Sequence, residues 1–321
     1  MPIWLVLILA DWYSKLSVVV RWKGSLSCSF HVKSGVRQGG TLSPALFNVF
    51  VNNVIDNVKD TKAGCTIDGF YIGIVMYADD ILLLAPTVHG LQRMLDACSV
   101  YFKQQRLDFN VKKSCCLAFG TASKTIVEPM VLQDKQIDWV ESFKYLGVSF
   151  SSGMRLVVNT MPMKRKFYAS CNSILSKTTN FNEILRLQLV ESNCLSFITY
   201  ALPSLNLSQS QIDELNVAWN TMYRKIFGFN KWESVKLFIA GLGRLDYKHI
   251  RASLCVNFVK NNLFSNNRTF NFVLIRFCLT DFCDLCKQFN FNLDIWKLHS
   301  LPHAHIRSEI FNAFHDKAGL F

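Results

Sequence analysis

The chain has 321 residues, half of them hydrophobic, and so carries enough apolar surface for a substantial buried core. Its 35 Lys and Arg residues outnumber its 23 Asp and Glu residues, and the formal net charge of +12 is typical of a protein that binds a polyanion, although a basic enzyme without such a partner is equally compatible. Eleven cysteines, an odd number without regular spacing, argue against a secreted disulfide scaffold and favour a nuclear or cytoplasmic location.

The chain opens with an apolar stretch, 2–10, that is followed at once by Asp11. This stretch is far shorter than the ~20 residues that cross a membrane, and no basic region precedes it, so neither a membrane partner nor an export signal is predicted. We expect a buried helix instead. Because a domain rarely begins with an apolar helix that has no cap, we also expect the chain to be part of a longer protein.

The first 154 residues mix short strands and helices irregularly, which predicts an α+β fold. β-prone runs at 17–22 and 26–32 predict a hairpin around Lys23-Gly24-Ser25. A glycine-rich segment then leads into a helix that begins near Pro44 and continues to Val58 along one apolar stripe. Further elements are expected over 72–77 (strand), 81–85 (strand), 87–105 (helix), 115–119 (strand) and 143–150 (strands).

The pattern changes after about residue 155, where β-prone runs fade and apolar residues recur at helical spacing. We therefore predict three regions: a mixed α+β region over 1–154, a helical region over 155–250 and a tail over 251–321. The tail is rich in aromatic residues and cysteine and has no clear periodicity, so the sequence assigns it no fold.

Two consecutive aspartates, Asp79 and Asp80, separate the expected strands at 72–77 and 81–85. At the tip of a tight hairpin between buried strands, two carboxylates repel each other and lose hydration unless a cation or hydrogen bonds compensate them. A divalent metal is one compensator, since nucleotidyl transfer uses two Mg²⁺ ions held by carboxylates and substrate phosphates. An ordinary Asp-Asp turn explains the pair at least as well when the pair is considered alone.

The surroundings of the two aspartates favour the metal. Tyr77-Ala78-Asp79-Asp80 lies between apolar runs, and residues 35–48, some way before it, have the sequence GVRQGGTLSPALFN. This combination resembles the palm domain of non-LTR retrotransposon reverse transcriptases, in particular those of the jockey and CR1-like elements. The resemblance implies that Asp79 and Asp80 are metal ligands, that Gln38 and Gly39 line the pocket of the incoming nucleotide, and that Arg37 contacts a phosphate or the template.

Two later segments resemble further motifs of the same family. Residues 107–114 resemble motif D, which implies a role for Lys113 near the triphosphate; a solvated turn is the alternative. Residues 143–148 resemble the primer grip, the hairpin that holds the end of the growing strand. The resemblance implies that Tyr145 and Gly147 shape this hairpin, whereas Leu146 is either part of it or a core residue.

The helical region resembles the thumb of this family, which grips the backbone of an RNA template and a DNA primer through basic side chains. Lys164, Arg165 and Lys166 are the phosphate contacts that the resemblance implies. A solvated basic face is the alternative for each of them.

One carboxylate of the family's catalytic site has no counterpart in this sequence. In this family the palm has a third acidic residue on a strand called motif A. That strand precedes motif B, the glycine-rich segment that residues 35–48 resemble. Asp11 is the only acidic residue before residues 35–48, and it lies in a segment that matches the helix between the two motifs. We therefore expect an incomplete palm, without fingers and motif A, and a chain that is inactive alone.

A separate pattern in the tail has the spacing of a Cys₂His₂ zinc site and comprises Cys283, Cys286, His299 and His303. Pro302 falls between the two histidines, where a zinc finger needs continuous helix. Partly buried cysteines without a metal are the alternative.

Three functions stay open from the sequence. The first is a fragment of an RNA-directed DNA polymerase that binds an RNA template, a DNA primer and dNTP with Mg²⁺. The second is a nucleic-acid-binding remnant without catalysis, and the third is the non-functional product of a decayed element. The sequence gives no indication of the oligomeric state.

Overall fold

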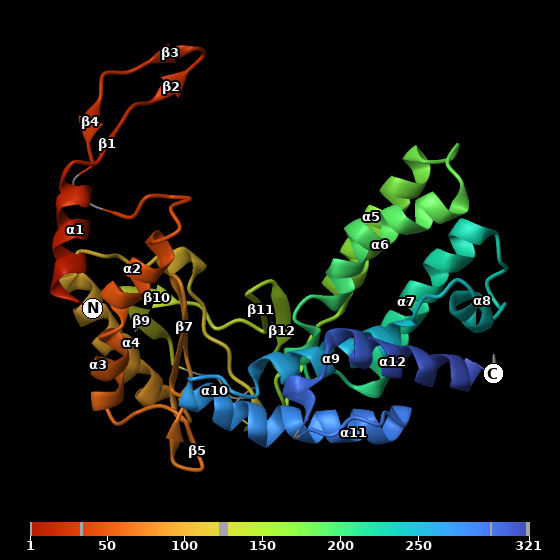
Figure 1. Ribbon diagram of the computed structural model, residues 1–321. Coiled ribbons are helices and arrows are strands. Elements are labelled where there is room, and N and C mark those ends of the chain that lie inside the picture. The colour runs from red at the N-terminus through yellow and green to blue at the C-terminus, as the bar shows by residue number, and fades with distance from the viewer. Residues whose placement is uncertain (1, 33–34, 122–127, 296, 319–321) are drawn as a thin grey trace. The chain divides into compact units, whose positions relative to one another are not determined.

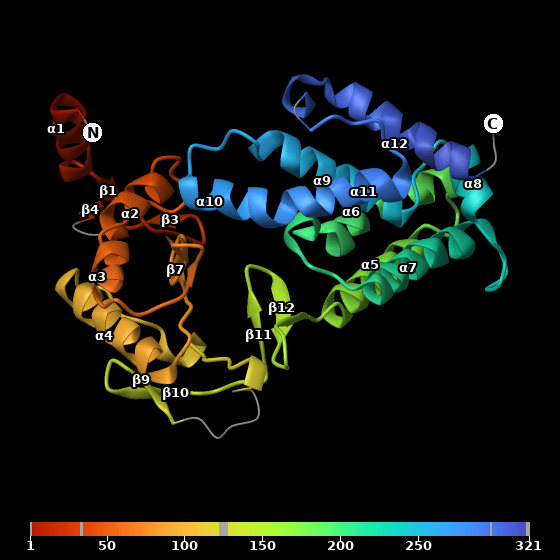
Figure 2. The ribbon, with the colours of Figure 1, turned by 90° about the horizontal axis from the view of Figure 1, so that it is seen from below.

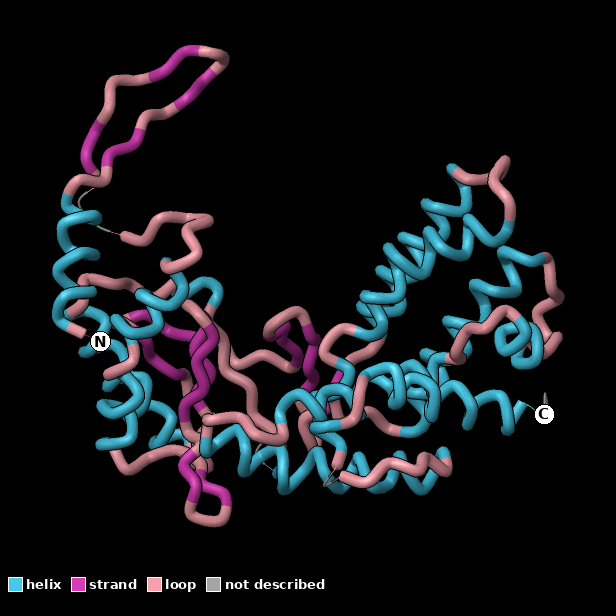
Figure 3. The backbone as a smooth tube through the Cα atoms, in the orientation of Figure 1, coloured by secondary structure: helices cyan, strands magenta, loops and turns pink. Residues whose placement is uncertain are grey.

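The computed structural model describes residues 2–32, 35–121, 128–295 and 297–318, and the chain folds into two compact units, residues 1–108 and 109–321 (Figure 1). Small sheets are followed by a mainly helical C-terminal part, which confirms the α+β class in this coarse form and is visible along the tube in Figure 3. None of the described helices is both long and apolar enough to span a membrane. The boundaries predicted near residues 154 and 250 fall within the second unit and stay predictions.

The first unit combines helices with two-stranded antiparallel sheets, in which β1 pairs with β4, β2 with β3, β5 with β6 and β7 with β8. Its elements are α1 (Ile3–Ser14), β1 (Ser17–Val18), β2 (Arg21–Trp22), β3 (Ser25–Leu26), β4 (Phe30–His31), α2 (Ser43–Val51), α3 (Val54–Asp60), β5 (Thr66–Ile67), β6 (Phe70–Tyr71), β7 (Ile74–Tyr77), β8 (Asp80–Leu83) and α4 (Val88–Gln104).

The core of the first unit lies between α3 and α4. Val54 and Val58 of α3 and Met94 of α4 are completely buried. The helix α4 begins where it does because Thr87 caps it: the Thr87 hydroxyl accepts a hydrogen bond from the amide of Gly90 at 3.1 Å. The helix predicted over 87–105 is thereby confirmed.

The single helix expected from Pro44 to Val58 is wrong, because the chain forms two helices there. The helix α2 ends at Val51 and α3 begins at Val54, with Asn52 and Asn53 between them. Asparagine side chains compete for backbone hydrogen bonds and disfavour the interior of a helix, so two in succession favour a break.

The helix α1 is present, but the prediction that it is buried is wrong. None of its residues is buried, and Ile3, Trp4 and Leu7 are each more than half exposed. Its apolar residues occur on all sides of the helix, so they define no single face for packing against the described residues.

Among the residues that the structure describes, four hairpins close through two-residue turns in which both residues have positive φ. Turns of this kind match the right-handed twist of the paired strands. Glycine occupies the second turn position in three of them, where it avoids the steric cost of a side chain. The hairpin predicted around residues 23–25 is confirmed as one of these turns, which are Lys23-Gly24, Asp68-Gly69, Gln133-Asp134 and Leu146-Gly147.

The second unit begins with short strands and continues with helices. The strand expected over 115–119 is wrong, because that segment makes only an isolated bridge between Cys116 and Trp139 among the described residues. The elements are η1 (Val111–Lys113), β9 (Met130–Leu132), β10 (Lys135–Ile137), β11 (Ser142–Tyr145), β12 (Val148–Ser151), β13 (Val157–Val158), α5 (Met161–Lys177), α6 (Glu183–Thr199), η3 (Leu202–Ser204), α7 (Gln209–Phe227), α8 (Lys236–Gly241), α9 (Tyr247–Asn262), α10 (Arg268–Val273), η4 (Leu274–Cys278), α11 (Leu279–Phe289), η5 (Leu298–Ser300) and α12 (His303–Ala318).

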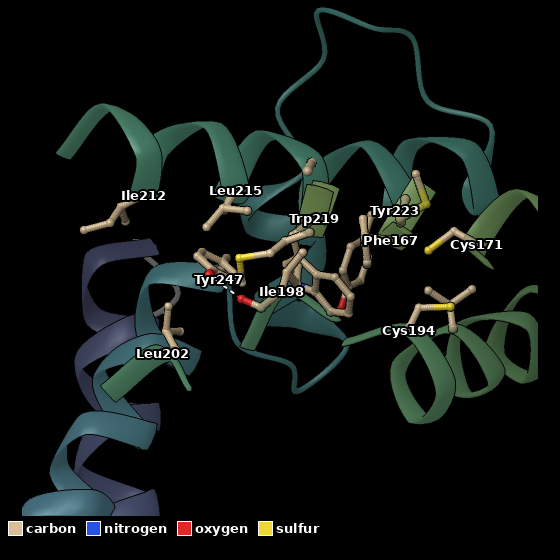
Figure 4. Packing of buried hydrophobic residues seen from close by; sticks show 14 of the residues in the cluster. Phe167, Cys171, Cys194, Ile198, Leu202, Ile212, Leu215, Trp219, Tyr223 and Tyr247 are labelled. Carbon is tan, nitrogen blue, oxygen red and sulfur yellow. Dashed lines mark hydrogen bonds between the residues drawn. The ribbon is translucent and has the colours of Figure 1, made fainter. Parts of the chain in front are cut away.

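Aromatic side chains fill the space between α5, α6 and α7, as Figure 4 shows. Phe167 of α5 and Trp219 and Tyr223 of α7 are at most 1% exposed, and the rings of Trp219 and Tyr223 meet edge to face with centroids 5.5 Å apart. The hydroxyl of Tyr247 in α9 donates a hydrogen bond to the carbonyl oxygen of Ile198 at 2.7 Å. The burial of these large rings gives the helical part its main stabilisation.

The ends of α6 and α7 are set by capping residues. Asn182 accepts a hydrogen bond from the amide of Leu185, and Ser208 forms a reciprocal capping box with Gln211. Gly228 ends α7 in the left-handed conformation with φ of 73°.

The tail, to which the sequence assigned no fold, is helical (Figure 2). A second core unites α9, α11 and α12, with Val256, Ile306 and Ile310 completely buried. The segment from α10 to α11 is interrupted by the π-helical turn η4. A π-turn inserts an extra residue and shifts the phase of the apolar positions, which explains why the periodicity was not evident in the sequence.

A partly buried carboxylate connects α6 to its surroundings. Glu191 accepts a hydrogen bond from the hydroxyl of Tyr223 at 3.3 Å and forms an ion pair with Arg244 at 3.2 Å. Burial raises the pKa of Glu191, and the Arg244 charge and the Tyr223 hydroxyl oppose that rise only in part. The folded chain therefore holds a proton on this carboxyl more tightly than the unfolded chain does.

We expect Glu191 to make the helical unit less stable as the pH rises. Because the pKa of Glu191 is higher in the folded chain than in the unfolded chain, protonation of this carboxyl stabilises the fold. This stabilisation is fully present below the unfolded-state pKa of about 4.3 and is lost as the pH rises through the folded-state pKa. Glu191→Gln removes this titration. The free energy of unfolding of the wild type minus that of the variant, from urea unfolding followed by circular dichroism, should therefore decrease from about pH 4 upward.

Glu183→Gln, which changes an exposed glutamate on the same helix, is the matched control and should not reproduce that decrease. A wild-type minus Glu191→Gln difference that stays constant or grows with pH would contradict the assignment.

Candidate functional site

The two aspartates lie at the closed end of the β7–β8 hairpin. Tyr77 pairs with Asp80, so Ala78 and Asp79 form a two-residue turn. Ala78 has φ of 52°, a left-handed conformation that costs a residue with a side chain roughly 1–2 kcal/mol, whereas Asp79 has no positive φ. Positive φ at the first turn residue alone is the pattern of a type II′ turn, which usually has glycine there. The turn that carries Asp79 thus contains a locally strained alanine.

Both carboxylates are exposed, and neither side chain makes a hydrogen bond or ion pair with the residues that the structure describes. The expectation that the flanking strands are buried is wrong, because β7 alternates half-buried with exposed residues and β8 is half-buried beyond Asp80. Water therefore solvates the pair. The two carboxylates are unpaired and can act as oxygen ligands of a cation. Because they are exposed, no cation is needed to compensate a loss of hydration.

The glycine-rich segment before α2 folds as a turn. Gly39 has φ of 78°, and the hydroxyl of Ser43 donates a hydrogen bond to the carbonyl oxygen of Arg37 at 2.6 Å. Arg37 and Gln38 line a cavity of about 330 Å³, and the two aspartates are not among its lining residues. The remaining lining residues are Tyr13, Leu16, Val18, Val32, Gly35 and Val36.

Lys113 lies at the end of η1 in the second unit and is exposed. Its amide donates a hydrogen bond to the carbonyl oxygen of Asn110 at 2.9 Å, which holds the backbone of this turn, while its ammonium group has no partner among the described residues. The side chain is thus free to reach an anion. Its role near a triphosphate stays a prediction.

The predicted primer grip is the β11–β12 hairpin, with Leu146 and Gly147 as its turn. Leu146 has φ of 44° and is 37% exposed, so it is a turn residue and not a core residue. A Cβ at Gly147 would meet the ring of Tyr200 at 3.0 Å. Glycine is therefore required at that position both by its φ of 85° and by the close approach of the ring.

The three basic residues at the start of α5 differ in their surroundings. Lys164 forms an ion pair with Glu214 of α7, and its side chain is only 16% exposed. Arg165 and Lys166 are exposed, and their side chains have no partner among the described residues. The latter two are therefore better placed to contact a phosphate.

The structure does not assemble the predicted zinc site. In the described ranges no three His, Cys, Asp or Glu side chains come close enough to share a metal, and all four predicted ligands lie within those ranges. His303 forms a hydrogen bond with Asn257 at 2.8 Å through Nδ1, and the ring of His299 packs edge to face on Phe264. Burial, with a smaller contribution from Cys283, raises the pKa of Cys286 to about 11, so this thiol is protonated at neutral pH.

Sequence reasoning missed the strained Ala78, the ring of Tyr200 against Gly147 and the Glu214 partner of Lys164. Only the first had a local indication, since a two-residue turn between strands needs positive φ. The other two partners lie far away along the chain.

Comparison with known proteins bears on this arrangement. Residues 2–150 match the family model described as "Reverse transcriptase (RNA-dependent DNA polymerase)". The chain is 34% identical over 127 residues to a Pol polyprotein of the type-1 retrotransposable element R2 from Nasonia vitripennis, covering 37% of this chain and 12% of that protein.

Two further relatives extend the comparison. The chain is 28% identical over 137 residues to an R2 Pol polyprotein from Popillia japonica, covering 40% of this chain and 23% of the relative. It is 23% identical over 208 residues to the RNA-directed DNA polymerase from mobile element jockey of Drosophila melanogaster, covering 61% of this chain and 22% of the relative. The matched region is thus less than a quarter of the length of each of these relatives.

Residues 2–150 are a reverse transcriptase domain of the non-LTR retrotransposon type. This reverse transcriptase domain contains the glycine-rich turn, the Asp79-Asp80 hairpin, Lys113 and the β11–β12 hairpin.

We expect the turn of the reverse transcriptase domain at Leu146 to be strained. A residue that tolerates positive φ at this position should therefore stabilise the hairpin. Leu146→Asn creates an Asn-Gly pair, which accommodates positive φ at both positions, and should stabilise the hairpin by about 0.5–1 kcal/mol. Thermal unfolding of the purified chain measures the change. Leu146→Ala keeps a side chain that disfavours positive φ and should give no such gain; equal gains from both variants would contradict the strain.

Proposed function

We propose that the reverse transcriptase domain takes part in RNA-templated DNA synthesis, with Asp79 and Asp80 as ligands of catalytic Mg²⁺. The observation that carries this proposal is a pair of adjacent carboxylates, unpaired and exposed at a strained hairpin turn, inside a segment that matches the reverse transcriptase family. Hard oxygen ligands on a short, fixed turn are what Mg²⁺ prefers.

The donor set fits Mg²⁺ in part. Asp79 and Asp80 can each offer a carboxylate oxygen, and no neighbouring basic side chain among the described residues neutralises them. Bound Mg²⁺ would supply charge neutralisation at the attacking hydroxyl and at the leaving pyrophosphate. The contribution of this chain's residues is to hold that charge at a fixed point beside the nucleotide.

A third carboxylate near this turn is not found among the described residues of the first unit. Asp11 is engaged elsewhere, since it forms an exposed ion pair with Lys15 within α1. We propose that the 321-residue chain alone does not extend a primer and that a strand outside these residues completes the site, because two metal ions need more ligands than adjacent aspartates provide.

The remaining contacts are proposed from the resemblance and from exposure. Arg37, Gln38 and Gly39 would border the incoming dNTP, and the cavity beside Arg37 and Gln38 is compatible with a contact of that kind. Lys113, whose ammonium group has no partner among the described residues, would stabilise negative charge on the triphosphate or donate a proton to the leaving group.

The second unit would hold the template and primer. The β11–β12 hairpin with Tyr145, Leu146 and Gly147 would act as the primer grip, and Arg165 and Lys166 would contact backbone phosphates. We also propose that the protein acts in the nucleus or the cytoplasm and that it derives from a jockey or CR1-like element.

A second function, nucleic-acid binding without catalysis, is favoured by one observation: the described residues of the first unit bring no third carboxylate to Asp79 and Asp80. Template and primer binding through basic side chains does not need that carboxylate. Primer extension separates the two functions.

We expect Asp79→Asn to abolish primer extension in a longer polypeptide that includes the preceding family segments, by about a hundred-fold or more, because the amide removes a charged metal ligand. Binding of a primer-template duplex should persist, since it rests on the second unit. Asp60→Asn, which changes an exposed carboxylate at the end of α3, is the control and should leave extension unchanged. Full activity of Asp79→Asn would refute the proposed metal ligand, whereas Mg²⁺-dependent extension by the 321-residue chain alone would refute the proposal that a further strand completes the site.

We expect the three basic residues of α5 to contribute unequally to the salt dependence of duplex binding. Each lost phosphate contact should reduce the slope of log affinity against log salt by about 0.9, so Arg165→Gln with Lys166→Gln should reduce it by about 2. Lys164→Gln should change it less, because Glu214 already pairs with that lysine. Fluorescence anisotropy over a salt series measures the slopes, and a larger effect from Lys164 than from the pair would reject the assignment.

A further inference from the structure

The loop between α7 and α8 carries Trp232, which at 83% is the most exposed large apolar side chain among the described residues. A single exposed apolar side chain is ordinary on a protein surface and needs no explanation by itself. Tryptophan is nevertheless a residue that usually buries most of its surface. What makes Trp232 informative is the way in which the loop around it is built.

Hydrogen bonds fix both ends of this loop. The amide of Asn230 donates to the carboxylate of Glu233, and the amide of Glu233 donates back to the carbonyl oxygen of Asn230 at 3.2 Å. The guanidinium of Arg224 donates to the carbonyl oxygen of Glu233 at 2.9 Å. Trp232 therefore lies within a closed turn whose flanking residues, Asn230 and Glu233, are held by hydrogen bonds, and its own side chain is exposed.

The other apolar side chains of the loop point inward. Phe229 packs on Phe238 with ring centroids 4.9 Å apart, Phe227 packs on the same ring at 4.6 Å, and Val235 is 1% exposed. Apolar packing is thus available on either side of the turn. Trp232 alone among these residues is left to solvent.

The charges around Trp232 favour an anionic ligand. Residues 224–236 contain Arg224, Lys225, Lys231 and Lys236, and Glu233 is the only acidic residue among them. The Glu233 carboxylate is already bound to the amide of Asn230, whereas the ammonium of Lys231 has no partner among the described residues. An exposed indole beside free positive charge suits a nucleotide, which offers an aromatic base and a phosphate together.

We propose that Trp232 stacks on an unpaired base of single-stranded nucleic acid while Lys231 contacts an adjacent phosphate. This inference rests on the proposed function only in taking the ligand to be nucleic acid, and it is independent of Asp79 and Asp80. Every base presents a flat π face to the indole, so the site is tolerant of sequence. It requires a single-stranded segment, because the bases of a duplex are stacked on one another.

The test measures the affinity of the 321-residue chain for a single-stranded RNA of roughly 12 nucleotides and for a blunt duplex. Trp232→Ala should weaken single-strand binding by about five-fold to a hundred-fold, the range expected for one lost stacking contact, and leave duplex binding unchanged. Trp232→Phe should retain most of the affinity because phenylalanine still stacks. Val217→Ala, which removes another exposed apolar side chain from α7, is the matched control and should change neither affinity.

Two further readouts separate stacking from phosphate contact. The wild type should lose tryptophan fluorescence on binding the single strand, and that part of the loss should be absent in Trp232→Phe. Lys231→Gln should reduce the salt slope of binding, whereas Trp232→Ala should preserve it. Unchanged single-strand affinity of Trp232→Ala would overturn this inference and leave the proposed function standing; failure of the wild type to bind either nucleic acid would overturn both.

Discussion

The right-handed twist of paired strands sets the geometry of both turns on which the proposed chemistry depends. A two-residue connection fits twisted antiparallel strands only if one or both turn residues adopt positive φ. The chain meets this demand with Ala78 in one turn and with Leu146 followed by Gly147 in the other. The strain is local and modest, and it fixes the register: Tyr77 pairs with Asp80, so one carboxylate lies in the turn and the next begins the strand. Adjacent carboxylates on so short a turn cannot move far apart, which is what a shared cation requires.

Not all of the 35 Lys and Arg side chains are free to bind a polyanion. Lys164, Arg244 and Lys248 each form an ion pair within the second unit, and Glu214, Glu191 and Asp213 are their respective partners. Such pairs leave the overall charge unchanged but reduce the number of cations free to displace counterions from a phosphate backbone. The unpaired Arg165, Lys166 and Lys231 therefore matter more than their share of the total suggests.

Sequence patterns predicted best those elements whose limits are set locally. The helix α4 follows from Thr87 and an apolar stripe, and the β7–β8 and β11–β12 hairpins follow from short apolar runs around polar or glycine-containing turns. The exposure of α1 and the break at Asn52 and Asn53 were not predicted, because an apolar stripe shows that a residue can be buried without showing that a partner surface exists. The tail escaped prediction because the π-turn at Leu274–Cys278 shifts the helical periodicity of the apolar residues around it. In the candidate site the sequence showed which residue types are present but not which of them pair. Glu214, the partner of Lys164, lies 50 positions away, and only the folded chain brings the two together.

The two units bury their apolar side chains to different extents. In the second unit, the aromatic core of α5, α6 and α7 and the core of α9, α11 and α12 leave large side chains such as Trp219, Tyr223 and Phe314 almost completely buried. In the first unit, α1 buries none of its residues, and β7 and β8 form a sheet of only two strands among the described residues. A two-stranded sheet is marginally stable in water, and each exposed apolar side chain forgoes roughly 1.5–3 kcal/mol of burial free energy. The second unit therefore carries its own stabilisation, whereas the position of the Asp79-Asp80 turn depends on a unit with little apolar surface buried. Any partner strand that extends the β7–β8 sheet would stabilise the turn and bring further residues towards the two carboxylates in the same step.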